Sequence, residues 1–401
     1  MSQPTDAPAR ADSGNGVHAD VAWSAEVRTD NDAFGSLQQD WEDLYVRCPA
    51  ATPFQSFAWL ESWWHEYGRQ SGRLRLVLIR AGGRLAAAAP LLLERRGPWS
   101  VLTPLGGDES DYHDVLIDPT VAARAAGELA VAVAGIPGWS VLDIREARSD
   151  AHIHQLAGSW PGARWRTRGA AGFEIPAGSV AEFLAVLPRS ARKKVRGKLR
   201  KVDTCGIEAR AVTACELPDA VHGLLRLHEQ QWRGRAVNPE HLRDRYRRHL
   251  TRALGPMIER GQAVLTQYRF GGEVVVSEVS LIAPGFVGKY LAGFEPRMRQ
   301  HIDVALMMLC QALQLAERSG RPAVSLLRGD EPYKQRWHPT PVRSERLLLA
   351  RPDSRLPAVG YAMLVRGRTS VADLVKRRIP WLRSMGGRAR ATIRLMGVPR
   401  R

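Results

Sequence analysis

Two segments of this 401-residue chain repeat one pattern: an apolar strand, a Gly-Gly turn and a second apolar strand. The first is LVLIRAGGRLAAAAPLLL, beginning at Leu76, and the second is VLTQYRFGGEVVVSEVSLI, beginning at Val264. Two glycines between apolar runs predict a tight β-hairpin. Helical patterns precede both hairpins, so we expect a diverged tandem duplication. Such turns are common, however, and the repeated hairpin alone is weak evidence.

Strand and helix patterns alternate along the rest of the chain, which predicts an α/β fold. Helices are expected at 56–67, 121–133, 151–160, 187–202, 217–232, 241–258 and 302–317, and strands at 74–80, 84–93, 140–144, 286–291, 323–327 and 346–350. A chain of this length usually forms about two domains. We expect a disordered N-terminal tail (1–22), a first domain (23–177), a second domain (178–352) and a basic C-terminal tail (353–401).

Composition indicates a soluble, cytoplasmic protein, with 44% apolar and 25% charged residues. The first twenty residues are polar and partly acidic, unlike a secretory signal. The longest apolar runs are far shorter than the ~20 residues of a membrane-spanning helix.

Four scattered cysteines without a C-x-x-C pair or a nearby histidine cluster argue against a disulfide framework and a metal site, so we expect buried or inert thiols. Motifs for nucleotide hydrolysis, dinucleotide redox chemistry, zinc proteolysis and serine hydrolysis are absent from the sequence.

The net charge of +17 is concentrated at one end of the chain. From Arg366 to Arg401 there are eleven Lys or Arg residues against one acid, Asp373, which accounts for 10 of the 17 charges. Basic residues interleaved with apolar ones suit the surface of an anionic membrane. Disorder, or nonspecific attraction to nucleic acid, is the alternative.

A second basic segment, LPRSARKKVRGKLRKV at 187–202, is expected as a helix between the two halves. It is either a solvated connecting helix or an electropositive wall for phosphate or another anion. The candidate wall residues are Arg192 and Arg196.

The segment RGDEPYKQRW at 328–337 follows a buried strand, where α/β proteins tend to place ligands. A carboxylate such as Asp330 can take a proton from a nucleophile, and Lys334 or Tyr333 can stabilise an oxyanion. The alternative is a charged loop anchored by its aromatic residues, including Trp337.

In the first half, SDYHDVL places His113 between Asp111 and Asp114. This group either acts in catalysis or, more commonly, caps a loop.

Four segments, TPFQSFAWLESWW, LPRSARKKVRGKLRK, KYLAGFEP and GDEPYKQRW, occur in this order over roughly residues 40–350. Together they resemble the GNAT acetyltransferases named for the CelD/BcsL proteins of cellulose biosynthesis, a family related to the FemAB peptidyltransferases. The G-D-x-x-Y-K-x-x-W element is the most specific. The resemblance implies two tandem GNAT-like domains with mixed central sheets, and acyl transfer mainly in the second.

By this resemblance, acetyl-coenzyme A or another acyl-CoA is the donor. The backbone of 288–293 would face the acyl carbonyl, and the start of the following helix would hold the pyrophosphate. This chain departs from the family at 300–302, where relatives tend to have small residues or proline. Glycine there lets a ligand approach the backbone closely. The residues expected to bind the cofactor instead are Arg297, Arg299, Gln300 and His301.

The resemblance also places Lys334 near the reaction centre, with Tyr333 beside it and Arg192 and Arg196 lining the same cleft. Glu278 is a candidate base; its alternative is a strand carboxylate that faces solvent. His228 and Trp232 either border the acceptor pocket or pack a helix.

Three functions follow. The first is acyl transfer from coenzyme A to an amine or hydroxyl of a sugar, polysaccharide precursor or small metabolite. The second uses aminoacyl-tRNA as the donor. The third is a catalytically silent module in envelope polysaccharide assembly, for which the altered turn at 300–302 is the main support.

Overall fold

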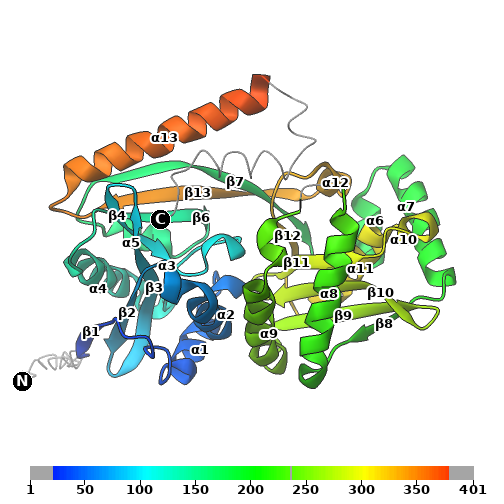
Figure 1. Cartoon of the computed structure of the whole chain (residues 1–401), viewed down its shortest axis with the longest axis horizontal. Helices are drawn as coiled ribbons and strands as arrows, with labels where there is room; N and C mark the ends of the chain where they lie inside the picture. The colour runs from blue at the N-terminus through cyan, green and yellow to red at the C-terminus, as the bar shows by residue number, and fades with distance from the viewer. Residues whose placement is uncertain (1–20, 235–236, 379–401) are drawn as a thin grey trace, which may run out of the picture.

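The computed structural model describes residues 21–234 and 237–378, and one long mixed sheet runs through this part of the chain (Figure 1). The strands are β1 (Trp23–Arg28), β2 (Arg73–Ala81), β3 (Arg84–Arg96), β4 (Trp99–Pro104), β5 (Leu116–Ile117), β6 (Val141–Arg148), β7 (Arg164–Pro176), β8 (Glu208–Ala211), β9 (Ala263–Phe270), β10 (Glu273–Ile282), β11 (Val287–Phe294), β12 (Ala323–Arg328) and β13 (Thr340–Ala350).

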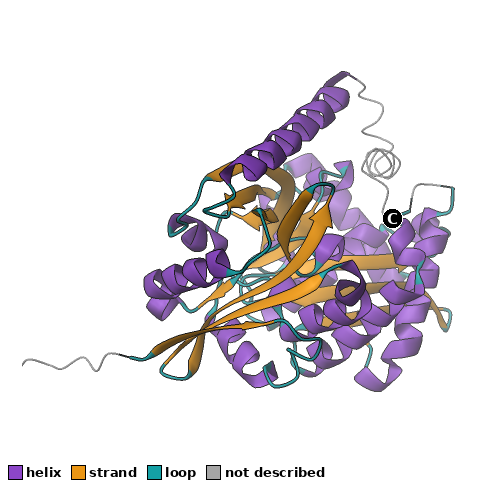
Figure 2. Cartoon of the chain, turned by 60° about the vertical axis from the view of Figure 1, so that its left-hand side comes forward, coloured by secondary structure: helices purple, strands orange, loops and turns teal. Residues whose placement is uncertain are grey.

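The helices cover both faces of this sheet (Figure 2). The α-helices are α1 (Gln38–Arg47), α2 (Phe57–Trp63), α3 (Arg69–Ser71), α4 (Ala122–Gly135), α5 (Ile153–Gly158), α6 (Val180–Val186), α7 (Arg189–Thr204), α8 (Leu217–Trp232), α9 (Asp244–Glu259), α10 (Met298–His301), α11 (Val304–Arg318), α12 (Pro332–Gln335) and α13 (Arg355–Arg378). The predicted α/β fold is confirmed.

The two hairpins are near copies of one another. The four turn glycines have positive φ in the same sequence, 57° and 80° at Gly82 and Gly83 and 59° and 84° at Gly271 and Gly272. Glycine adopts a positive φ at both central positions without strain, which accounts for the Gly-Gly pair in each turn. In each hairpin the arginine at the strand end donates to the second glycine carbonyl at 2.9 Å, as seen for Arg80 and Arg269.

Each half also contains a pair of neighbouring parallel strands that separate after a short contact. β4 and β6 are parallel neighbours at only two positions, Val101 opposite Val141 and the next pair. β11 and β12 likewise pair only at Val287 with Val324 and at the next pair. Beyond these pairs the strands separate, so each half contains a V-shaped opening in its sheet.

The last strand of each half completes the sheet of the other half. The strand order is β1-β2-β3-β4-β6-β13-β7-β12-β11-β10-β9-β8, with β5 beside β3. Thus β7, from the first half, pairs with β12, and β13, from the second, pairs with β6. The expected final strand is therefore not at an edge but in the middle of the sheet. The domain boundary at 177/178 stays a prediction, and the two halves are interlocked across it.

Apolar contacts between the halves add to this interlock. The core of the second half, under α8 and α9, includes Phe54, Trp59 and Tyr112 from loops and a helix of the first. Trp59 meets Tyr290 of β11 edge to face with ring centroids 5.2 Å apart. Such aromatic pairs bury large areas, so the two halves form one packed unit.

The prediction of a basic C-terminal tail from residue 353 is wrong for the first part of that segment. Arg355–Arg378 is a helix, α13, whose inner face packs on β4 and β6 of the first half and on β13 of the second. The buried residues of that face are Ala358, Tyr361, Ala362 and Val365. Their i, i+3, i+4, i+7 spacing is that of an amphipathic helix, which the basic composition concealed. Residues 1–20 and 379–401, which carry the rest of the predicted tails, lie outside the described residues.

The four cysteines are free, and Cys215 is exposed rather than buried. Burial raises the pKa of the Cys48 thiol to about 12 and that of Cys310 to about 11.

Within residues 21–234 and 237–378, no group of three or more histidine, cysteine or acidic side chains is placed to hold a metal ion. The helices of this part are also too short or too polar to cross a membrane.

Candidate active site at the junction of the two halves

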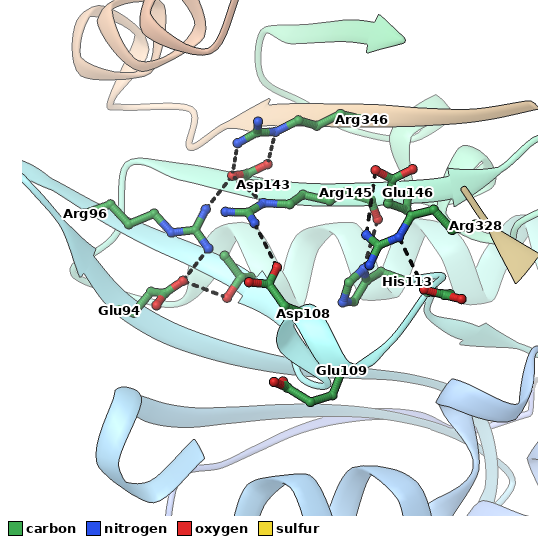
Figure 3. Close-up of polar contacts among 12 residues, drawn as sticks. Glu94, Arg96, Asp108, Glu109, His113, Asp143, Arg145, Glu146, Arg328 and Arg346 are labelled. Carbon is green, nitrogen blue, oxygen red and sulfur yellow. Dashed lines mark hydrogen bonds and ion pairs between the residues drawn. The ribbon is translucent and has the colours of Figure 1, made fainter. Parts of the chain in front are cut away.

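The strand exchange brings the loop after β12 against the loop after β4. Arg328, the last residue of β12, reaches into the first half, where its Nε lies 3.3 Å from Asp111 Oδ1. Its Nη1 lies 3.9 Å from Glu146 Oε1 on β6 (Figure 3). An arginine from one half is thus held between two carboxylates from the other, which makes this junction the candidate site.

Asp111 is the carboxylate at this junction that is best suited to proton transfer. Burial raises its pKa, and Glu146 adds to this effect, while Arg328 and Lys334 act in the opposite direction. Its side chain nevertheless keeps 21% of its surface accessible. A partly accessible carboxyl with a raised pKa is a suitable general base or acid.

The other two polar residues of SDYHDVL are structural. Asp114 accepts hydrogen bonds from the backbone N–H groups of Val115, His152 and Ile153 at 2.7–2.9 Å, so it holds its own loop and the start of α5. His113 is buried beside the Arg145 carbonyl, 3.0 Å from its Nδ1. Burial, with Arg328 and Arg145 nearby, lowers the pKa of His113 to about 4, so it is neutral near pH 7.

Arg145 lies beside this junction, among the carboxylates of the first half (Figure 3). Its guanidinium is 3.6 Å from Asp108 and 3.9 Å from Asp143, and its buried Nε has no hydrogen-bond partner. Burial and the neighbouring arginines lower its pKa, yet 40% of the side chain is accessible. Asp143 is instead bound closely by Arg346 at 2.6 Å and Arg96 at 2.7 Å. Although burial opposes ionisation, these guanidinium groups hold the pKa of Asp143 well below its usual range.

Lys334 is buried at the end of β12. Its Nζ donates to the carbonyls of Arg328 and Gly329 at 3.1 and 3.3 Å, and lies 2.9 Å from Glu331 Oε2. The two carbonyls engage two of the ammonium hydrogens and Glu331 is an ion-pair partner without a hydrogen bond, so Lys334 fixes the loop that presents Arg328. Its neighbours Tyr333 and Asp330 are exposed. Glu331 is the most exposed partner and is therefore the one that an incoming oxyanion can replace.

Glu278 does not lie at the junction. Its side chain is buried, not solvent-facing, and it accepts a hydrogen bond from the Tyr268 hydroxyl. Lys289 Nζ donates to the same carboxylate at 2.7 Å and to the Met308 carbonyl at 3.0 Å. The candidate base from the second hairpin thus belongs to a closed polar cluster between β10, β11 and α11.

The start of α11 does not fit a pyrophosphate. Asp303 caps this helix, accepting from the Leu306 backbone N–H at 3.1 Å. Lys198 Nζ and Arg336 Nη2 contact the same carboxylate at 2.7 and 3.0 Å. Burial opposes ionisation, but these contacts lower the pKa of Asp303, so the carboxylate stays charged. An anion already occupies the place where the resemblance puts the phosphates of coenzyme A.

The four residues expected to bind that cofactor lie on an exposed turn. Arg297 is paired with Glu273 at 2.8 Å and with Glu295. Arg299 stacks its guanidinium over the Phe294 ring, 5.0 Å from the centroid. Gln300 and His301 are exposed at the end of α10. The Arg297 and Arg299 side chains are therefore engaged with neighbours rather than turned toward the start of α11.

The helix α7 presents an open groove of about 970 Å³ whose lining is basic. The lining residues are Arg189, Ser190, Arg192, Lys193, Arg196 and Arg200. Arg192 also donates to the carbonyls of Ala185 and Leu187, at 2.7 and 3.1 Å, and so caps α6. Trp337 is buried beneath this region, with its ring 6.2 Å from that of Phe183. The predicted electropositive wall is present as a one-sided stripe on α7.

His228 packs α8 onto β11. Its Nδ1 lies 2.8 Å from the Ala292 carbonyl, and its Nε2 is 3.2 Å from His241 Nδ1. Burial lowers its pKa, so it is neutral. Trp232 lies one turn further along α8, with its ring 6.2 Å from that of His228. This is the helix-packing arrangement that was the alternative to an acceptor pocket.

Two residues of the junction, Glu146 and Arg145, carry no sequence motif, and Arg328 stands out only as the first residue of the segment at 328–337. Each lies in or at the end of a strand, where alternating burial dominates the pattern. Only the exchange of β7 and β13 brings them together, and that exchange leaves no local trace in the sequence.

Comparison with known proteins agrees with this architecture. Residues 189–335 match the family model described as an acetyltransferase (GNAT) domain. The structure is similar to that of FemX, with a TM-score of 0.56, 11% identity and coverage of 81% of this chain and 96% of that one. A conserved protein of unknown function from Bacteroides thetaiotaomicron gives a TM-score of 0.53 at 14% identity, over 81% of this chain and 100% of that one.

A tandem GNAT protein from the clavulanic acid biosynthesis pathway gives a TM-score of 0.40 at 12% identity, over 82% of this chain and 99% of that one. No curated protein sequence matches the chain. At their low identities the similarities to FemX and to the Bacteroides thetaiotaomicron protein show the fold alone, and the GNAT match of residues 189–335 agrees with an α/β fold of GNAT type.

Proposed function

We propose that this chain is a transferase that moves an acyl group from aminoacyl-tRNA to an acceptor. The match of residues 189–335 to a GNAT acetyltransferase domain supports the transferase class but not the choice of donor. The acceptor is an amine or hydroxyl of a sugar, polysaccharide precursor or small metabolite. A role alongside cellulose or envelope polysaccharide synthesis belongs to this proposal and rests on the resemblance of four sequence segments.

The observation that carries the choice of donor is the Asp303 carboxylate at the start of α11. The pyrophosphate of coenzyme A would have to displace it from Leu306 N–H, Lys198 and Arg336. Two like charges a few ångströms apart repel strongly in a partly buried site. This geometry disfavours acyl-CoA at the expected place.

The basic stripe on α7 suits the phosphate backbone of a nucleic acid. Its members Arg189, Lys193, Arg196 and Arg200 recur at spacings of three or four residues, which keeps them on one face of the helix. At a rise of about 1.5 Å per residue the stripe is roughly 16 Å long, enough for several consecutive phosphates. The groove is open, as a large polyanion requires.

The junction supplies groups for the transfer itself. In the proposed reaction the acceptor amine or hydroxyl attacks the ester carbonyl, and Asp111 takes the proton that it loses. As the carbonyl oxygen gains charge, Lys334 offers it the ammonium hydrogen that the two loop carbonyls leave unused, beside its ion-pair partner Glu331. Collapse of the intermediate breaks the ester bond, and the leaving tRNA oxygen takes the proton that Asp111 accepted, which leaves a free tRNA hydroxyl and restores the carboxylate.

The test compares two donors on the same full-length protein. Labelled total tRNA, charged with amino acids, is titrated at several salt concentrations into the wild type and into an Arg196→Gln/Arg200→Gln variant. If both arginines contact phosphates, the variant binds more weakly, and the slope of log affinity against log salt falls by about 2. The matched control is Lys194→Gln/Lys201→Gln, which removes the same charge from another face of α7. Equal behaviour of the two variants would reject the groove as the tRNA site.

Calorimetric titration of acetyl-coenzyme A tests the other donor. We expect no saturable binding to the wild type, and a gain of binding in Asp303→Asn, which leaves Lys198 and Arg336 without their carboxylate partner. Tight binding to the wild type would overturn the choice of donor and restore acyl-CoA, the candidate that the GNAT match favours. If neither donor binds, the catalytically silent module becomes the better explanation.

A further inference from the structure

The outer face of α13 carries apolar side chains that the described part of the chain leaves uncovered. Leu356 is 84% exposed, Met363 is 68% exposed and Leu364 is 36% exposed. They account for three of the ten exposed large apolar side chains in the described residues, and all three lie on one helix. Their i, i+7, i+8 spacing places them on a single stripe.

This stripe cannot turn inward, because the opposite face of α13 is fixed to the protein. Tyr361 donates to Asp143 Oδ2 at 2.7 Å, and its ring packs edge to face against Trp99. Trp99 in turn donates to the Pro357 carbonyl at 2.9 Å. The helix lies along the outside of the molecule, and its C-terminal end projects past the sheet (Figures 1 and 2).

Basic side chains accompany the stripe. Arg355, Arg366 and Arg368 are exposed on α13. The 28 residues that follow Asp373 contain nine Lys or Arg and no Asp or Glu. A helix with an exposed apolar stripe and flanking arginines has the composition of a segment that lies in the headgroup region of an anionic membrane.

We propose that the outer face of α13 docks this protein on the surface of an anionic lipid bilayer. The apolar side chains enter the boundary between headgroups and acyl chains, and the arginines remain at the phosphates. The charge and the apolar stripe together favour a bilayer over a second copy of the chain or a nucleic acid. A second copy would bring two strongly basic segments together, and a nucleic acid would leave the apolar stripe in water. The inference is independent of the donor and of the chemistry at the junction.

The test uses the full chain and co-sedimentation with phosphatidylcholine vesicles, with and without phosphatidylglycerol. The wild type is expected to sediment with the anionic vesicles only, and less so as salt rises. Leu356→Ser/Met363→Ser keeps every charge, the terminal segment included, and removes most of the stripe. Its vesicle affinity should fall by roughly tenfold or more, since each buried side chain of this size contributes about that factor.

The matched control is Val46→Ser/Val131→Ser, which removes two equally exposed apolar side chains from α1 and α4. Circular dichroism melts establish that all variants fold. The proposal is overturned if the stripe variant sediments like the control, or if binding does not depend on anionic lipid. It is also overturned if sedimentation velocity shows a self-association that the stripe variant abolishes, because the stripe would then belong to a dimer.

Discussion

Acidification should weaken the contact between the two halves through one histidine. His249 of α9 is completely buried against α2, and its Nδ1 lies 3.0 Å from Ser62 Oγ. The Ser62 hydroxyl donates its hydrogen to the His249 carbonyl. The His249 ring therefore donates its Nδ1–H to the Ser62 hydroxyl oxygen. Nε2 of the ring is left buried without a hydrogen-bond partner. The His249 ring packs against the Trp59 ring, with the two centroids 4.6 Å apart. A proton added at Nε2 would place an unpaired charge in the interface.

The magnitude follows from the pKa of this group. Burial lowers the pKa of His249 from 6.5 to about 3. Below about pH 6.5 the unfolded chain therefore binds a proton that the folded protein excludes, and stability falls with pH until it levels off near pH 3. One pKa unit is worth about 1.4 kcal/mol, so the free energy of unfolding should fall by about 2 kcal/mol between roughly pH 6.5 and 5 from this residue alone.

The assay is urea unfolding of the wild type and of His249→Asn across this pH range. The asparagine amide can donate a hydrogen bond in place of Nδ1–H but cannot be protonated. The variant therefore loses the pH-dependent contribution of His249 to stability as well as the packing of the ring. It should be less stable near neutral pH, and the difference from the wild type should shrink by about 2 kcal/mol on acidification. Other histidines, such as His113, contribute equally to both proteins. A difference that stays constant with pH would refute the assignment.

Two further predictions concern the junction and the helix that packs behind it. Asp111→Asn should lower kcat/KM by roughly 10²–10⁴-fold and remove an acidic limb that lies above the pKa of an ordinary aspartate, because burial raises the pKa of Asp111. An unchanged rate with the identified donor would exclude it as the base. Gly293→Ala should destabilise by roughly 1–3 kcal/mol, because a Cβ there would lie 2.3 Å from the His228 backbone nitrogen. Gly223→Ala, on the helix α8 that carries His228 and with no atom within 4 Å of the added Cβ, should instead stabilise by up to about 1 kcal/mol.

The fold was predictable where the pattern is local. Both Gly-Gly hairpins and the long helices α8 and α11 follow from turn chemistry and periodicity, and the structure has them within a few residues of the expected bounds. The exchange of β7 and β13 was not predictable, because a strand's own sequence specifies which face is buried but not which neighbour it pairs with. The helix α13 was missed because its charges were given more weight than the spacing of Ala358, Tyr361 and Val365.

The candidate site was predictable only as separate pieces. The polar segment after a buried strand drew attention to Lys334, and a histidine between two carboxylates drew attention to the group that includes Asp111. The structure places both residues beside Arg328. Arg328 itself stands at the start of the segment RGDEPYKQRW but had no predicted role, because a charged residue at a strand end commonly marks only the boundary with solvent. Glu278 was expected to face solvent if it was not a base. It is buried because α11 and its neighbours cover that face of β10, so a charged residue within this strand had to find partners in Tyr268 and Lys289.

The two observations that select the donor are physically linked through Lys198. Its ion pair with Asp303 turns this position of α7 toward α11. Residues two positions away on a helix lie about 200° around its axis, so Arg196 and Arg200 must then point outward into the groove. The contact that closes the start of α11 to a pyrophosphate thus also orients the stripe for a polyanion. Asp303→Asn should therefore change the two affinities in opposite directions, strengthening acetyl-coenzyme A binding and weakening tRNA binding. A substitution that merely disturbed the fold would weaken both.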